Sequence, residues 1–293
     1  MQKTPTISLT ALLLPLTLLL TGCSTTLPTW QAAPAAPDQA AELLATAVAA
    51  HGGDAYGELS NVAVSYDGFW GRLVPRLQPI LSDTKFRRAS EERYWPREQR
   101  VWQRHEGPDG IKTVIRGPND EVAVRYFTSD EEREGSTDEH AASALVADAY
   151  TLFLFGPSYI EHHAQALSLL EPGIEDGKSY PRILARLSPG FGLSEEDRVA
   201  LWFDPDTDRL FRVHFSIDGF ESTQGATVDV TFSDYREIGG YYWPTHFRER
   251  VRAPVRAFAH EWRTVGLDVE RAAMPSFAGS ELDDAPAQVL STR

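Results

Sequence analysis

The 293-residue chain contains a single cysteine, Cys23. One cysteine excludes an intramolecular disulfide, a four-cysteine zinc site and a CxxC redox pair. Basic residues are also few, since 28 lysines and arginines stand against 42 aspartates and glutamates and give a formal net charge of −14. A surface of this sign repels phosphate backbones, so the composition predicts no nucleic-acid partner.

The apolar run at the amino terminus is short. It covers the ten residues Ala11–Leu20 and includes Pro15, whereas a helix needs about 20 apolar residues to span a bilayer. Its length fits the apolar region of a secretory signal. The chain as a whole has an ordinary globular composition, with 42% hydrophobic and 24% charged residues. Wholesale disorder and a multi-spanning membrane protein are thereby excluded.

Common catalytic motifs are missing as well. The sequence has no Gly-x-Ser-x-Gly elbow, no phosphate-binding glycine loop and no His-Glu-x-x-His helix, each of which supports a widespread chemistry. We therefore predict no catalytic residue and no cofactor, and the expected protein is not an enzyme.

After the apolar run, the sequence Leu20-Thr21-Gly22-Cys23 resembles the lipobox of bacterial lipoproteins. The resemblance implies that residues 1–22 are a signal peptide and that Cys23 carries acyl chains such as palmitate. Several chains on one residue make membrane attachment effectively permanent. Because Ser24 rather than aspartate follows, we expect an anchor in the outer membrane facing the periplasm. Retention at the inner membrane and an incidental cysteine after a plain signal are the alternatives.

The remaining chain divides into three parts by composition. Residues 23–38 are rich in Ser, Thr, Pro and Ala and are predicted to be a flexible tether after the lipidated cysteine. Residues 39–273 form one β-rich domain, because neither a repeat nor a low-complexity break interrupts them. Residues 274–293 are predicted to be a loose tail.

Two helices and about eleven strands follow from the apolar patterns. Gln39–His51 is a predicted helix that Asp38 caps and Gly52-Gly53 ends. Thr137–Phe155 is the second, stopped by Gly156-Pro157, and it is either a lid or a buried core helix. The strands are Val62–Trp70, Lys85–Tyr94, Arg100–His105, Ile111–Arg116, Val122–Phe127, Tyr180–Leu187, Val199–Phe203, Leu210–Ile217, Thr227–Phe232, Tyr242–Val251 and Phe258–Leu267.

Short connections between these strands predict an antiparallel sheet. The fold class is α+β, mainly antiparallel β, with a large curved sheet or unclosed barrel and helices packed as a lid. Alternation places Val228, Val230 and Phe232 on the apolar face and Arg248, Arg250 and Arg252 on the wet face. A sheet this wide needs side chains or a ligand to fill it. The candidate residues of an apolar cavity or lid are Leu152, Phe153, Phe155, Trp70, Trp102, Trp202 and Phe232.

Two segments carry a family resemblance. Residues 201–210 (LWFDPDTDRL) and 228–244 (VDVTFSDYREIGGYYWP) resemble hairpin motifs of the lipoprotein-carrier (LolA-like) superfamily, as does the Ala-His-Gly-Gly run at 50–53. The resemblance implies an unclosed antiparallel barrel with a helical lid over a hydrophobic cavity. Carriers of that group are commonly soluble, so a tethered chain departs from their pattern.

Metal sites are weakly indicated, and we predict none. Asp204, Asp206 and Asp208 have the spacing of a calcium loop, but its glycine and final glutamate are missing, so a hairpin turn is expected. Glu161-His162-His163 would need a distant ligand such as His140. His51 is expected to be cationic at a helix C-terminus.

Three functions remain open on the sequence. The first is a tethered lipoprotein that binds a lipid or acyl chain between sheet and lid, the second is a non-catalytic envelope or stress-sensing scaffold with a filled core, and the third is a metal-assisted enzyme. The enzyme would need His51, His140, His162 and His163 to converge. Two basic stretches, around residues 85–104 and 248–256, are either solvated strand faces or a surface for anionic head groups or an acidic partner.

Overall fold

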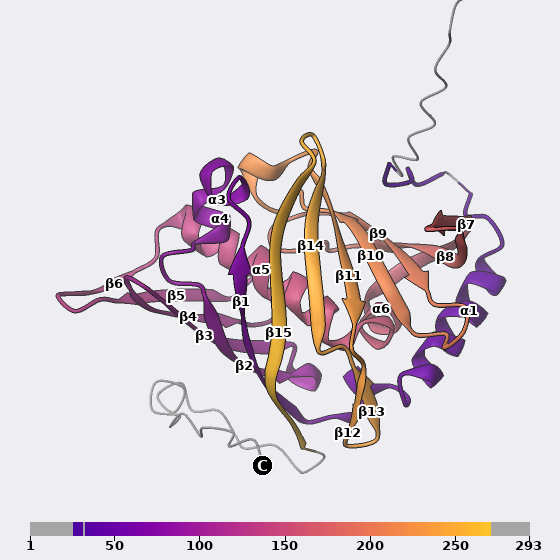
Figure 1. Cartoon of the computed structure of the whole chain (residues 1–293), viewed down its shortest axis with the longest axis horizontal. Helices are drawn as coiled ribbons and strands as arrows, with labels where there is room; N and C mark the ends of the chain where they lie inside the picture. The colour runs from indigo at the N-terminus through magenta and orange to yellow at the C-terminus, as the bar shows by residue number, and fades with distance from the viewer. Residues whose placement is uncertain (1–25, 32, 271–293) are drawn as a thin grey trace, which may run out of the picture.

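The computed structural model describes residues 26–31 and 33–270, and its main feature is a curved antiparallel sheet that wraps around one long helix (Figure 1). The sheet has thirteen strands in the order β6-β5-β4-β3-β2-β1-β15-β14-β11-β10-β9-β8-β7, and β12 and β13 form a separate hairpin. The two edges, β6 and β7, are not joined. The predicted unclosed, mainly antiparallel α+β fold is therefore confirmed.

The strands are β1 (Asn61–Trp70), β2 (Ala89–Trp95), β3 (Arg100–Gly107), β4 (Gly110–Arg116), β5 (Val122–Phe127), β6 (Glu132–Glu134), β7 (Ala164–Glu175), β8 (Lys178–Leu187), β9 (Asp197–Phe203), β10 (Leu210–Ser216), β11 (Thr227–Ser233), β12 (Arg236–Ile238), β13 (Tyr241–Trp243), β14 (His246–Ala253) and β15 (Ala257–Glu270). The helices are α1 (Pro37–Ala50), α2 (Ala55–Glu58), α3 (Val74–Leu77), α4 (Pro79–Ser82), α5 (Thr137–Phe155) and α6 (Pro157–His163), with 3₁₀ turns η1 (Pro96–Glu98) and η2 (Glu221–Thr223).

The two faces of the sheet follow the side-chain alternation of the sequence. Val228, Val230 and Phe232 of β11 are buried in the core on the concave face. Arg248 and Arg250 of β14 are exposed on the opposite face. Successive side chains of a strand point to opposite faces, so the pattern alone determines this outcome, and the prediction is confirmed.

Helix α5 lies in the hollow of the sheet (Figure 1). It begins at a capping box in which Ser136 and Glu139 bond each other's backbone N–H, and it ends at Gly156, whose φ is 52°. The predicted bounds, Thr137–Phe155, are confirmed. Twelve of its nineteen residues are buried, and its last six are buried without a break. Because a helix that is apolar all round is a core helix, the structure selects the core alternative for α5.

The strand count exceeds the prediction for local reasons. β7 is not predicted because Pro172-Gly173 interrupts its pattern. The predicted strand 242–251 is two strands, β13 and β14, because Pro244 removes a ladder donor between them. Helices α3, α4 and α6 have four to seven residues, too few to show a helical period in the sequence.

The first helix differs slightly from its prediction. It starts at Pro37, and Asp38 lies in its first turn instead of capping it. Its end is as expected, since Gly52 and Gly53 have φ values of 97° and 118°, which favour glycine.

The segment ahead of α1 packs on the outer face of the sheet. Leu27 is 7% exposed and clusters with Leu184 of β8 and Ala200 of β9. Arg198 donates from Nη1 to the carbonyl of Pro28 at 2.9 Å. Where the sequence predicts a flexible tether, the described residues of this segment are attached to β8 and β9.

Two phenylalanine-to-alanine substitutions test the core position of α5. Phe153 is 2% exposed and its ring contacts Phe215, Phe232 and Phe247, whereas Phe69 is 56% exposed. Phe153→Ala should lower the free energy of unfolding by about 3–5 kcal/mol. Phe69→Ala, the matched control, should change it by less than about 0.5 kcal/mol. Urea unfolding measures both, and equal small effects would contradict a core position for α5.

Candidate functional site

Helix α5 divides the hollow of the sheet into two compartments. Ala149 and Phe153 face a small apolar one of about 50 Å³. Asp148, Thr151 and Phe155 face a larger one of about 400 Å³ with a mixed polar and aromatic wall. The deep apolar cavity expected beneath the helix is thus reduced to a small apolar space, because α5 itself fills most of the hollow.

The apolar compartment lies between α5, the sheet and the short helices α3 and α4. Its wall includes Trp70, Val74, Leu81, Phe153, Phe215 and Val228. Of the seven candidate cavity residues, Trp70 and Phe153 line this space. The side chains come from segments far apart in sequence, and their common apolar character follows from their inward positions.

The other five candidate residues lie elsewhere. Leu152 is fully buried in the core, and Phe232 contacts Phe153 with ring centroids 6.0 Å apart. Phe155 lines the polar compartment. Trp102 and Trp202 alternate with core residues of their strands and therefore lie on the outer face, away from both compartments.

Trp202 is buried despite its place on the outer face. The guanidinium groups of Arg182 and Arg212 lie 4.7 and 5.1 Å from its ring. Gly173 of β7 covers the ring so closely that a Cβ there would come within 2.1 Å of it. The β7–β8 hairpin thus folds over the outer face, which explains why hydrophobicity alone misplaces this tryptophan.

Arg87 is a buried cation at the wall of the apolar compartment. It is 3% exposed, and its guanidinium carbon lies 5.1 Å from the Trp70 ring and 4.9 Å from the Tyr150 ring. Its Nη1 donates to the carbonyl of Leu81 at 3.3 Å. The sequence leaves the basic stretch at 85–104 as either a solvated strand face or a binding surface, and Arg87 belongs to neither because it is buried. Stacking between two aromatic rings stabilises a buried guanidinium.

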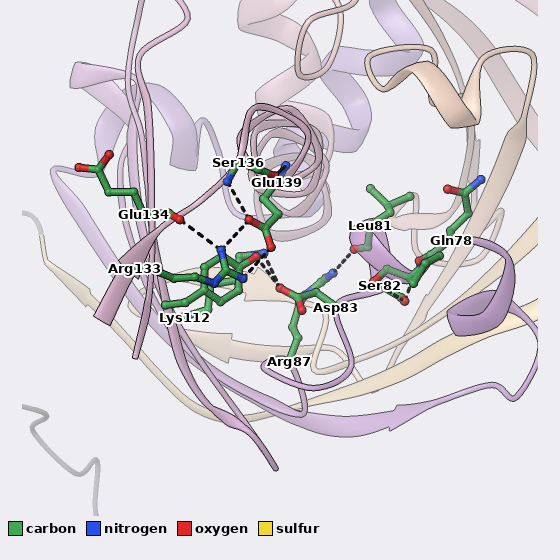
Figure 2. A network of polar contacts seen from close by, with 12 residues as sticks. Gln78, Leu81, Ser82, Asp83, Arg87, Lys112, Arg133, Glu134, Ser136 and Glu139 are labelled. Atoms are coloured by element: carbon green, nitrogen blue, oxygen red, sulfur yellow. Dashed lines mark hydrogen bonds and ion pairs between the residues drawn. The ribbon is translucent and has the colours of Figure 1, made fainter. Parts of the chain in front are cut away.

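A buried ion pair attaches the end of α4 to the sheet (Figure 2). Asp83 follows α4 and accepts from Lys112 Nζ of β4 and from the Tyr126 hydroxyl of β5, each at 3.0 Å. Burial lowers the pKa of Lys112, and the carboxylate of Asp83 opposes that shift. Breaking a buried pair leaves an uncompensated charge, so this end of the α3–α4 segment is firmly held.

The middle of the α3–α4 segment is held far more weakly. Gln78 accepts from the Ser222 hydroxyl at 2.7 Å and donates to the Ser222 carbonyl at 2.9 Å, and both bonds are exposed to solvent. Neutral hydrogen bonds each contribute only about 0.5–1.5 kcal/mol. The segment over the apolar compartment is therefore firmly held at its Asp83 end, where Arg87 also bonds the Leu81 carbonyl, and more weakly at Gln78.

Exposed apolar side chains surround this segment. Phe69, Leu73, Leu77 and Ile80 are 56%, 42%, 55% and 37% exposed. They lie on the same stretch of chain as Trp70, Val74 and Leu81, which line the compartment. Apolar surface inside and outside the segment is an arrangement that suits the passage of an apolar molecule.

The polar compartment has charged groups that are already paired. Arg116 binds Asp148 with Nε to Oδ1 at 3.1 Å, and Asp148 also accepts from Gly192 N–H at 2.8 Å. Burial raises the pKa of Asp148, while Arg116 opposes the shift. Burial also raises the pKa of Tyr159. These groups can hold a polar ligand, but they do not present a nucleophile next to a free base.

The suspected metal ligands separate in the structure. His162 Nε2 lies 2.7 Å from Asp54 Oδ2, and Glu161 lies close to both. His163 instead directs Nδ1 to the Tyr159 carbonyl at 2.8 Å. The expected divergence of the two histidines is confirmed. Asp54 is the residue that sequence reasoning missed, because it lies more than a hundred positions away, and His140 is not in the group.

The Asp-rich segment between β9 and β10 is a turn, as predicted. Asp204 Oδ1 accepts from the N–H groups of Asp206 and Thr207, and Lys178 bridges Asp204 and Asp206 at 2.8 and 2.7 Å. Local backbone bonds of this kind are typical of aspartates in turns.

His51 ends α1 as expected, but it is not cationic. It is buried, and its Nδ1 lies 2.8 Å from the Ala47 carbonyl, so this nitrogen carries the proton. Desolvation, with a smaller effect of Arg209, lowers the pKa of His51 to about 4, although the hydrogen bond to the Ala47 carbonyl opposes this shift. The prediction of a cationic imidazole is wrong because burial outweighs the helix dipole.

Comparison with solved structures gives likenesses of fold. A DUF1329 family protein from Desulfovibrio piger is 12% identical with a TM-score of 0.49, over 79% of this chain and 93% of that one. A LolA superfamily protein from Nitrosomonas europaea is 13% identical with a TM-score of 0.40, over 80% and 94%. The lipoprotein LppX from Mycobacterium tuberculosis is 16% identical with a TM-score of 0.25, over 60% and 88%.

No family model and no curated protein matches the sequence. Within residues 26–31 and 33–270, no helix is long and apolar enough to cross a bilayer. Cys23 and the signal segment 1–22 lie outside the described residues.

The neutral His51 makes stability depend on pH. An unfolded His51 takes up a proton below pH 6.5, whereas the folded one resists protonation down to about pH 4. Its contribution to stability is therefore complete above pH 6.5 and falls as the pH drops, by about 2 kcal/mol between pH 7.5 and 5.

Urea unfolding of the wild type and of His51→Gln at both pH values measures this contribution. The variant cannot titrate at this position. Between pH 7.5 and 5 it should therefore lose about 2 kcal/mol less stability than the wild type. An equal loss in both proteins would show that the folded His51 accepts the proton.

Proposed function

We propose that this protein is a bacterial outer-membrane lipoprotein, anchored through Cys23 and facing the periplasm, that binds a lipid or acyl chain in the apolar compartment beneath α3 and α4. One observation carries the proposal. The segment that closes the compartment has apolar side chains on both its inner and its outer surface, and its middle is held to the loop opposite by the Gln78–Ser222 contact. The binding role is non-catalytic.

The entrance is at α3 and α4 and not at α5. Opening at α5 would separate Phe153 from three aromatic neighbours and would expose a run of buried residues. Opening at α3 and α4 breaks the two exposed Gln78–Ser222 hydrogen bonds and the bond from Arg87 to the Leu81 carbonyl, and it exposes Val74 and Leu81, while the Asp83–Lys112 pair keeps the hinge end in place. The lower cost favours the short helices as the moving part.

Ligand binding can supply the energy of this opening. A space of about 50 Å³ is too small for a long chain, so the α3–α4 segment has to move outward. Burying a 14-carbon chain releases roughly 11 kcal/mol before ordering costs, at about 0.8 kcal/mol for each CH₂. That gross gain exceeds the few kcal/mol expected for the hydrogen bonds broken and partial exposure of Val74 and Leu81.

A partner-binding scaffold is the second candidate. Its support is the filling of the hollow by α5, together with the arginines on the outer face of β14. A packed interior leaves the surface as the binding element, and an acidic envelope protein would complement the arginines. The same binding experiment separates the two candidates.

The experiment uses the mature-length chain, residues 24–293, which contains the whole described sheet and core, after removal of co-purified lipid. Val146 is partly buried and lines the apolar compartment. Val146→Trp should fill the space and weaken binding of a fluorescent fatty acid at least about tenfold, or about 1.4 kcal/mol. The control is the same exchange at Val265, which is 52% exposed on β15, and it should leave binding unchanged.

Native mass spectrometry of the same proteins gives the stoichiometry, with one chain per protein expected. Saturable binding that Val146→Trp does not weaken would move the site elsewhere. A wild-type protein that ignores both fatty acids and phospholipids would contradict lipid binding and leave the scaffold.

A further inference from the structure

The large exposed hydrophobic side chains gather at one end of the molecule. Six of the eight in the described residues belong to the end of β1, to the α3–α4 segment and to the β8–β9 and β14–β15 loops, which meet there, and we name them the apolar tip: Phe69, Leu73, Leu77, Ile80, Leu193 and Val255. The remaining two, Ile174 and Val265, lie on β7 and β15. A concentrated apolar surface marks an interaction site, whereas scattered single residues do not.

Contacts between these segments show that they adjoin one another. Gln78 binds Ser222, which joins α3 and α4 to the loop between β10 and β11. Leu193 N–H donates to the carbonyl of Gly219 in the same loop. The rings of Phe69 and Phe258 lie 5.7 Å apart and join the end of β1 to the start of β15. Figure 1 shows α3, α4 and the β14–β15 turn at the upper end of the molecule.

The outward side of the α3–α4 segment is itself apolar. Leu73, Leu77 and Ile80 of this segment are exposed. Val74 and Leu81 are turned inward and line the compartment. Exposing the outer apolar side chains of this segment to water costs free energy. Contact with an apolar medium on the outer side removes that cost.

The charged residues around the apolar tip indicate which apolar medium it contacts. Residues 68–82 and 250–260 contain no acidic residue, although the chain as a whole has a net charge of −14. The same stretches carry the exposed arginines Arg72, Arg76, Arg250 and Arg256, while the acidic residues Asp218 and Glu221 lie on the β10–β11 loop and Glu195 and Glu196 lie on the loop of Leu193. Apolar side chains with arginines beside them are typical of surfaces that enter the interface of an anionic bilayer.

The position of the amino-terminal segment also favours a bilayer as the binding partner of the apolar tip. Residues 26–31 are fixed on the outer face of β8 and β9 through Leu27 and the bond from Arg198 to Pro28. Thr26 lies three positions after Cys23, a reach of about 10 Å. In Figure 1 the segment ahead of α1 lies toward the same upper side as the tip. A lipid on Cys23 would hold that side toward the membrane.

We propose that the apolar tip docks into the interface of an anionic phospholipid bilayer, with its leucines among the acyl chains and its arginines at the phosphates. The α3–α4 segment would then open into lipid instead of water, which gives a lipid ligand a route that avoids the aqueous phase. Only the orientation rests on the proposed anchor at Cys23, because docking by the tip itself needs no acyl group on the protein.

The test is co-sedimentation of the unacylated chain, residues 24–293, with vesicles of phosphatidylethanolamine and phosphatidylglycerol. Leu73→Glu with Leu77→Glu should weaken vesicle binding at least about tenfold, because two buried apolar side chains are lost from the interface. The matched control is Ile174→Glu with Val265→Glu, which adds the same charge at comparably exposed positions and should bind like the wild type. Arg72→Gln with Arg76→Gln should weaken binding to these vesicles and not to phosphatidylcholine vesicles.

Fatty-acid binding by the same variants keeps this proposal separate from the proposed function. Loss of vesicle binding with retained fatty-acid binding supports docking by the tip. An equal loss in the control pair, or a folded wild-type protein that does not bind the anionic vesicles, overturns it and leaves a protein partner as the occupant of the tip. Far-ultraviolet circular dichroism establishes that each variant is folded.

Discussion

The burial of α5 against the concave face of the sheet is the constraint on which the rest of the structure depends. A helix with Leu152, Phe153 and Phe155 on different sides must be enclosed on nearly all of them. A flat sheet covers one side only, so the thirteen strands curve around the helix and their edges, β6 and β7, stay apart. The enclosed helix splits the remaining space, which produces the small apolar compartment on one side and the larger polar one on the other.

Polar groups buried at β2 and β3 make this part of the sheet rigid. Glu92 accepts hydrogen bonds from Ser90, Tyr94 and Gln103, and burial raises the pKa of its carboxyl group. Networks of this kind are stable only when their members are satisfied, so these strands are poor candidates for movement. The α3–α4 segment has no comparable network along its length apart from Asp83 at its end. The α3–α4 segment is therefore held more weakly than these strands, and it is the part of the compartment's wall that can open.

Regular features were predictable from the sequence and the placement of the site was not. The bounds of α5 follow from its capping box and from Gly156-Pro157, and the alternation in β11 predicts its inner face, because both are local signals. The inward position of Arg87 and the outward position of Trp202 depend on which strands and hairpins cover them, and a residue type cannot report that. Helices α3 and α4 are too short for periodicity, so the segment that closes the site was invisible before the fold was known.

The central claim is that α3 and α4, and not α5, open to admit an apolar chain. Hydrogen exchange measured by mass spectrometry, with and without palmitate, tests it most directly, since exchange reports local opening. The account predicts fast exchange across residues 72–82 in the free protein, slower exchange there on binding, and strong protection of residues 145–155 in both states. Ligand-dependent exchange in α5, with residues 72–82 unchanged, would contradict it.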